Sequence, residues 1–183
     1  MQCVDGLLSL RAGTVDGADI LSPMRSHFNW NDGICTSSCS KQTCADGHPG
    51  LDCRCGIYSV LDNGLHELAN YVQNSNQIVF VGWAFSTVHI YDWGVRSGQW
   101  VAVGVVNWHG FSDKVISPAH FHESWWDSAY SALDVLRTRQ VDKPKLYELD
   151  MVSVAIQQQI DLREQRNVAF NQLFGIQQQE NNV

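Results

Sequence analysis

The chain has 183 residues, of which 44% are hydrophobic and seven are Trp, as is typical of an ordinary globular domain and not of a disordered chain. Its formal net charge of -7 argues against a broad surface for nucleic acid or anionic membranes, because phosphate contacts need clustered Lys and Arg and only 12 are scattered here. The amino-terminal residues lack a basic region followed by an apolar stretch, and no long apolar window follows. We therefore expect a soluble, cytoplasmic protein.

The most informative segment contains five of the six cysteines and one histidine, with the spacing C-x3-C-x4-C-x3-H-x4-C-x-C. Its members are Cys35, Cys39, Cys44, His48, Cys53 and Cys55. The segment is polar and rich in turn-forming residues, so apolar packing alone cannot order it. Thiolates and imidazoles are preferred zinc ligands, and short loops bring them together at a small entropic cost. The pattern therefore predicts a zinc site.

Zinc takes four such ligands and the segment offers six. His48, Cys53 and Cys55 are the preferred three, and the fourth is one of the three earlier cysteines, between which spacing alone does not decide. The alternatives are disulfides in an oxidised protein or incidental thiols. In a reducing cytosol, closely spaced cysteines more often bind metal. Cys3 stands apart and is interpreted as a buried or incidental thiol.

A helix is predicted directly after Cys55 and Gly56, because apolar residues recur there at spacings of three and four. These residues are Val60, Leu61, Leu65, Leu68, Ala69 and Val72. The cysteines are therefore expected at the start of a helix.

From Gln77 the pattern changes to runs of β-branched and aromatic residues, QIVFVGWAFSTVHIYDWG and QWVAVGVVNWHG. The segment from Gly94 to Gly98 between them is turn-like, so the pattern predicts a hairpin or two strands of one sheet. A further helix is expected after Pro118, with one face formed by Trp125, Ala129, Leu133 and Leu136.

A long amphipathic helix is predicted from Leu149 to about Ile176, followed by a polar QQQENNV tail. Its apolar positions are Val152, Ile156, Ile160, Val168, Leu173 and Phe174. Such a helix is not stable alone, so its apolar stripe is expected to pack on its own domain, on a second copy or on another protein.

Together these elements predict an α+β fold, in which a small, mainly antiparallel sheet packs with helices and is held by a Cys/His zinc site. We expect a zinc-stabilised domain over residues 1–145 and a C-terminal helical extension with a polar tail over residues 146–183.

The run HPGLDCRCGIYSV, preceded by WNDGIC and followed further along by GVRSGQW, resembles a segment of small uncharacterised proteins of actinobacteria and their phages. That segment reads H-x-x-P-x-x-x-C-x-C-G-I-Y-A, with a later strand ending in Gly-x-Arg-Ala. The matching positions are Cys53, Cys55, Gly56, Ile57, Tyr58, Gly94 and Arg96. Pro49 directly after His48, and serines at 59 and 97 in place of alanines, depart from the pattern. The resemblance implies a shared compact domain and a phage or bacterial source, hence the host cytoplasm or a virion, but no activity.

The sequence also permits a cysteine-dependent hydrolase, similar to papain-like and NlpC/P60 enzymes in the order of Cys and His. The dipole of the predicted helix would stabilise a thiolate at Cys55, and His89 or His109 would serve as the base. However, a third orienting residue and the usual nucleophile turn are missing from the sequence. A cysteine two residues from another is also better explained as a metal ligand.

A metal-dependent hydrolase would instead use His120, His122 and Glu123, for which a solvated position before the next helix is the favoured interpretation. The function we expect is therefore a non-catalytic, zinc-binding structural or interaction protein. Its C-terminal helix would associate with itself or dock on a protein partner.

Overall fold

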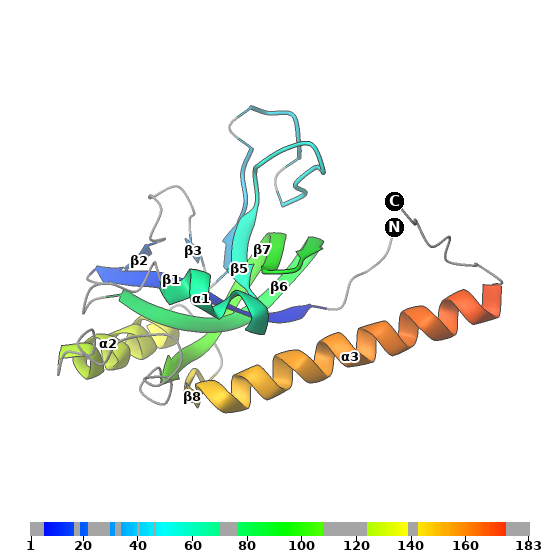
Figure 1. Ribbon diagram of the computed structural model, residues 1–183. Coiled ribbons are helices and arrows are strands. Elements are labelled where there is room, and N and C mark those ends of the chain that lie inside the picture. Colours follow the sequence, from blue (N-terminus) through cyan, green and yellow to red (C-terminus); the bar gives the residue numbers. More distant parts are fainter. Residues whose placement is uncertain are drawn as a thin grey trace.

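The computed structural model has the α+β fold that the sequence predicts, with a largely antiparallel sheet, helices packed on it and a long C-terminal helix (Figure 1). The residues that it describes are 6–16, 19–21, 30–31, 34–39, 41–45, 47–69, 77–107, 124–138 and 143–174. Among these residues, no helix combines the length and the apolar character needed to span a bilayer.

The centre of the sheet is a long hairpin formed by β6 (Gln77–Tyr91) and β7 (Gly94–Asn107). The predicted hairpin is confirmed, but its turn lies at Asp92 and Trp93, not at residues 94–98. Residues 94–98 are buried in β7, because the backbone there pairs with both β6 and β5 (Ile57–Val60). Gly94 is required at this position, since a Cβ atom would lie 2.3 Å from the carbonyl oxygen of Ser59.

The remaining strands extend the sheet on both sides of the hairpin. β1 pairs with β6 over eight residues, β4 pairs with β7, and β8 adds a parallel neighbour to β7. The bounds are β1 (Leu7–Asp16), β2 (Asp19–Leu21), β3 (Trp30–Asn31), β4 (Ile34–Thr36) and β8 (Lys145–Glu148).

The core lies between the sheet and its helices and is built from large apolar side chains. The largest fully buried ones are Trp100, Phe80, Leu7, Leu10, Ile57, Ile78, Leu136, Leu149, Ile156 and Val79. The indole Nε1 of Trp100 donates a hydrogen bond to Ser9 Oγ at 3.0 Å, and Ser59 Oγ donates to the same oxygen at 2.9 Å. These bonds give the buried hydroxyls of Ser9 and Ser59 and the indole N–H of Trp100 their hydrogen-bond partners.

The helix predicted after the cysteines is largely wrong. The cysteines lead into strand β5, which is followed by a 3-10 turn, η1 (Asp62–Gly64), and a short helix, α1 (Leu65–Ala69). Ile57 and Val60 are buried because β5 pairs with β7 and, at its end, with β1. Tertiary burial therefore overrides the helical spacing of the apolar residues.

The two later helices confirm the prediction: α2 (Ser124–Thr138) and α3 (Leu149–Phe174). Helix α3 begins directly after β8 and buries Leu149, Val152 and Ile156 in the core. One turn further, Gln159 Oε1 accepts a hydrogen bond at 2.9 Å from the backbone N–H of Leu8. The first half of α3 is thus part of the domain.

The second half of α3 leaves the body of the protein and projects beyond the sheet (Figure 1). Within residues 161–170 every side chain is exposed except that of Arg163, which is half-buried. Half or more of the surface of Leu162, Val168 and Phe170 is exposed. This part of the helix therefore receives little stabilisation from the domain itself.

Candidate metal centre

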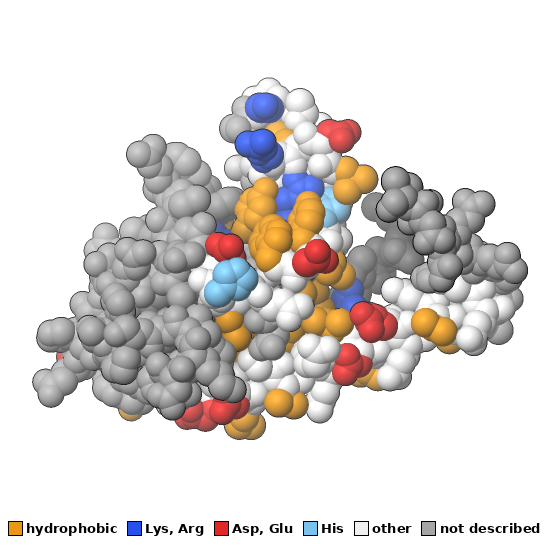
Figure 2. Space-filling model, in the orientation of Figure 1, with side chains coloured by type: hydrophobic (Ala, Val, Ile, Leu, Met, Phe, Trp, Pro, Cys, Tyr) orange, Lys and Arg blue, Asp and Glu red, His pale blue; other side chains and the backbone are white. Residues whose placement is uncertain are grey.

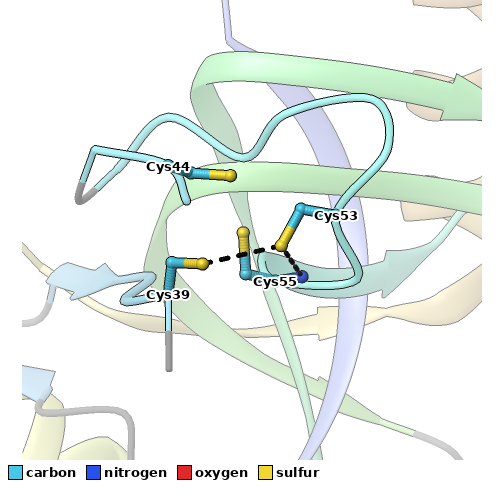
Figure 3. Close-up of side chains that lie close together, drawn as sticks. All are labelled: Cys39, Cys44, Cys53 and Cys55. Atoms are coloured by element: carbon cyan, nitrogen blue, oxygen red, sulfur yellow. Dashed lines mark hydrogen bonds between the residues drawn. The ribbon is translucent and has the colours of Figure 1, made fainter. Parts of the chain in front are cut away.

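Four cysteines of the loop that joins β4 to β5 come together (Figure 3). We call residues 37–56 the Cys loop. The four residues are Cys39, Cys44, Cys53 and Cys55, and their Sγ atoms all lie within 4.8 Å of one another. The loop stands out from the sheet in Figure 1, so the group sits at one end of the molecule and outside the apolar core.

The spacing of the four sulfur atoms fits a tetrahedral metal ion. With metal–sulfur bonds of about 2.3 Å, as in zinc sites, neighbouring sulfurs lie about 3.8 Å apart. The Sγ atoms of Cys39 and Cys53 are 3.6 Å apart, close to this value. The group could therefore hold a metal ion without large movement of the loop.

Tight turns place these cysteines, which explains the polar composition of the loop. Gln42 N–H donates to Cys39 O at 2.9 Å, and Cys53 N–H donates to Gly50 O at 3.2 Å. Gln42 and Gly47 have positive φ angles of 53° and 72°, which turns require and which Gly adopts without strain.

Backbone N–H groups also point at the sulfur atoms. Gly50 N–H donates to Cys44 Sγ at 3.3 Å, and Cys55 N–H donates to Cys53 Sγ at 3.4 Å. Hydrogen bonds of this kind favour the negatively charged thiolate, which is the form that binds a metal.

The Cys loop is fastened to the sheet by hydrogen bonds near Gly47. Ser37 N–H donates to Gly98 O at 2.8 Å, Gly47 N–H donates to Ser37 O at 2.9 Å, and Ser86 Oγ donates to Gly47 O at 2.8 Å. Gly98 is required here because a Cβ atom would lie 1.6 Å from the carbonyl oxygen of Gly47. Gly47 therefore lies directly against the backbone of β7 at Gly98.

Arg96 of β7 connects the loop to the sheet by a buried guanidinium group. Its side chain is 2% exposed and donates to the carbonyl oxygens of Gly50 at 3.0 Å, Cys55 at 3.3 Å and Cys53. Four thiolates around a divalent ion carry a net charge of -2, which a nearby guanidinium partly offsets. Arg96 thus orients the second half of the cysteine group, and its positive charge would partly offset that of a bound metal with four thiolates.

Aromatic side chains cover the base of the loop, where Figure 2 shows hydrophobic side chains gathered on the surface. The ring of Trp93 stacks on Tyr58 and on Tyr91, with centroid distances of 5.9 Å and 5.3 Å. Tyr58 Oη also donates to the carbonyl oxygen of Arg54 at 3.0 Å, which fixes the residue between Cys53 and Cys55. The stack therefore helps to hold the cysteine pair.

The four thiols differ in acidity when no metal neutralises them. The hydroxyl of Thr43 lowers the pKa of Cys39 to about 5, and the backbone N–H of Cys55 lowers the pKa of Cys53. Burial, followed by the neighbouring thiols, raises the pKa of Cys55 to about 12. Four neighbouring thiols cannot all ionise on their own, because the negative charges repel one another. A bound cation removes this repulsion and allows four thiolates.

Two of the six predicted ligands do not join the group. Cys35 is fully buried in β4 opposite Trp100, and burial raises the pKa of its thiol to about 12. His48 is exposed, and its Nδ1 lies 3.0 Å from the hydroxyl of Thr87 on β6. The structure therefore brings together four cysteines where spacing favoured a Cys/His set.

The cysteine-hydrolase alternative loses its main physical support. Cys55 precedes strand β5 and not the predicted helix, so the dipole of that helix is missing from the described residues around its thiol, and the pKa of this thiol is raised, not lowered. His89 Nε2 lies 2.7 Å from the carbonyl oxygen of Pro49 and is used to hold the loop. The other candidates, His109, His120, His122 and Glu123, lie outside the described residues, as does Cys3, which we interpret as a buried or incidental thiol.

No family model, no curated protein and no solved structure matches this chain. The resemblance to proteins of actinobacteria and their phages therefore stays a prediction. The evidence for the metal site is therefore the arrangement of the four cysteines.

Proposed function

We propose that this chain is a non-catalytic zinc protein in which the metal orders the Cys loop and helix α3 binds a second protein molecule. The observation that carries the proposal is the group of four cysteine sulfurs within 4.8 Å of one another. Structural zinc sites are typically four-coordinate with Cys ligands, whereas catalytic zinc sites keep a position for water or substrate. Four thiolates leave no such position.

Zinc is one of the two metals that this ligand set favours, and it is the one we propose. Four thiolates in a tetrahedral arrangement suit zinc or iron, while carboxylate and carbonyl oxygens suit calcium and magnesium. Because the loop contributes turns and polar residues but no apolar core, zinc would supply the free energy that orders it.

The second part of the proposal rests on α3. The apolar side chains Leu162, Val168 and Phe170 are half exposed or more on a segment that projects from the domain. An isolated helical segment of this length is marginal in water, so a partner molecule would stabilise it. Phage origin, with the host cytoplasm or a virion as its location, is proposed only from the resemblance around Cys53.

Elemental analysis of protein purified without added metal tests the zinc site. We expect about one zinc per chain and a loop that becomes sensitive to protease after chelation, since structural zinc contributes roughly 10–16 kcal/mol of binding free energy in small zinc domains. Cys39→Ser should lose the metal, whereas the matched control Cys35→Ala should keep it. Equal zinc content in the wild type and in Cys39→Ser would contradict the proposed site.

A further inference from the structure

Two of the four clustered cysteines have their sulfur atoms in contact. The Sγ atoms of Cys39 and Cys53 are 3.6 Å apart, and the hydroxyl oxygen of Thr43 lies 3.4 Å from the first and 3.8 Å from the second. Figure 3 shows the two side chains pointing toward each other. A disulfide bond is about 2.0 Å long, so the two sulfur atoms need to approach by only about 1.6 Å. The pair is therefore placed for disulfide formation as well as for metal binding.

Cys39 and Cys53 lie in different arms of the Cys loop, and hydrogen bonds that do not involve sulfur hold both arms. In the first arm, Ser37 N–H donates to Gly98 O at 2.8 Å. In the second arm, the guanidinium of Arg96 donates to the carbonyl oxygen of Cys53 itself. These contacts favour the same arrangement of the two arms whatever the sulfur atoms bind. A bond between the two sulfurs would tie the arms to each other.

Cys53 is the more accessible residue of the pair. It is half-buried, whereas Cys39 is only 8% exposed, and both lie in a loop outside the apolar core. The backbone N–H of Cys55 donates to Cys53 Sγ at 3.4 Å and so favours its thiolate, which is the form that peroxides oxidise. Cys35, by contrast, is fully buried in β4. An oxidant in water is therefore expected to reach Cys53 first, with Cys39 beside it as the second thiol.

We propose that Cys53 and Cys39 form a reversible oxidation site for hydrogen peroxide, in which a disulfide between them takes the place of the metal. The Cys53 thiolate attacks one peroxide oxygen, the O–O bond breaks, and a sulfenic acid and a hydroxide ion form. The Cys39 thiolate then attacks the Cys53 sulfur, the S–O bond breaks and a second hydroxide ion leaves. The two thiolates lose two electrons in total, and these reduce one peroxide to two hydroxide ions.

The disulfide removes two of the four ligands of the proposed zinc site. Cys44 and Cys55 alone would hold zinc much more weakly, because structural zinc sites are four-coordinate. Oxidation differs from chelation in that it leaves the two arms joined, so the loop stays closed while the metal is released. A thiol reductant reverses the bond by thiol–disulfide exchange and restores the ligands. This inference rests on the proposed zinc site and adds its regulation.

Hydrogen peroxide added to the full-length, zinc-bound chain tests the oxidation site. We expect the release of about one zinc per chain, detected with a weak chromogenic chelator, together with the loss of two free thiols. Mass spectrometry of a digest should identify a peptide pair that is joined between Cys39 and Cys53. Limited proteolysis should cut the loop of the reduced, chelated chain but spare that of the oxidised chain. Dithiothreitol should then restore zinc binding.

Cys35→Ala is the matched control, because Cys35 lies outside the sulfur group, and it should release zinc and form the same bond. Three results would overturn the oxidation site while leaving the zinc site in place. These are zinc that peroxide does not release, a disulfide between another pair of cysteines, and an oxidised loop that protease cuts as readily as the chelated one. Elemental analysis of the untreated chain tests the metal site separately, and a chain without zinc would overturn both proposals.

Discussion

The β6–β7 hairpin and the Cys loop, which connects two strands of the same sheet, are stabilised by different interactions. In the hairpin, side chains such as Phe80 and Trp100 are fully buried, so apolar burial provides the free energy of folding. In the Cys loop the large apolar residue Leu51 is 79% exposed, and the contacts are turns, hydrogen bonds and thiols. A small protein can thus add an ordered projection to its core without enlarging that core, provided that a metal replaces apolar packing.

This difference predicts that substitutions in one region affect mainly the stability of the domain and that substitutions in the other affect mainly metal binding. A change in the hairpin should lower the stability of the whole domain and leave the metal in place. A change in the contacts that hold the Cys loop should mainly affect the metal.

The largest expected effect on stability is that of Phe80→Ala, because Phe80 is fully buried at the centre of the sheet. Removing a buried aromatic ring and leaving a cavity typically costs about 3–5 kcal/mol of unfolding free energy. Urea unfolding should show this loss, while the folded fraction should still contain one zinc per chain. Loss of zinc from folded Phe80→Ala protein would show that the two regions are coupled more strongly than their contacts indicate.

An intermediate effect is expected for Arg96→Met, which keeps most of the side-chain volume but removes the donors to Gly50, Cys53 and Cys55. Leaving these carbonyl groups without a partner should cost about 2–3 kcal/mol. Zinc affinity, measured by competition with a chelator, should fall roughly 10- to 100-fold, as for other groups that orient metal ligands.

The control for Arg96 is Arg54→Met, since Arg54 lies between the same two cysteines but is exposed. This variant should keep wild-type stability and zinc affinity. An equal loss of affinity in both variants would mean that overall positive charge, and not the hydrogen bonds of Arg96, supports the site.

The smallest effect is expected for His48→Ala. His48 is exposed and contacts Thr87 instead of the sulfur group, so its loss should cost no more than about 1 kcal/mol. Zinc content should not change in elemental analysis. Loss of zinc from this variant would restore the Cys/His ligand set that the spacing favours.

The sequence predicted the elements whose pattern is long and regular. The runs of β-branched and aromatic residues from Gln77 onward and the apolar stripe after Leu149 identify the hairpin and α3, because long patterns of these kinds are typical of buried strands and of a helix with one buried face. It did not predict that Ile57–Val60 forms a strand. This short segment has helical spacing, and only its pairing with β7, far along the chain, decides its conformation.

The candidate site shows the same limit. All four clustered cysteines were among the predicted ligands, but spacing could not exclude Cys35 or His48. Cys35 is removed from the group by the burial of β4 against β7, and His48 by its contact with the β6 residue Thr87. Both causes are tertiary contacts. The contacts of Arg96 with the loop could not be predicted from the sequence for the same reason, because Arg96 lies on β7, more than forty residues further along the chain.

The direct passage from β8 into α3 has a mechanical consequence. Glu148 ends the strand and Leu149 begins the helix, so no flexible residues separate the sheet from the projecting segment. The direction of the helix is therefore set by the parallel pairing of β8 with β7 and by the burial of Leu149, Val152 and Ile156. A single residue inserted at this junction would turn Leu149, Val152 and Ile156 by about 100° around the helix axis and so move them out of the core. The junction thus sets the angle at which the end of α3 is presented.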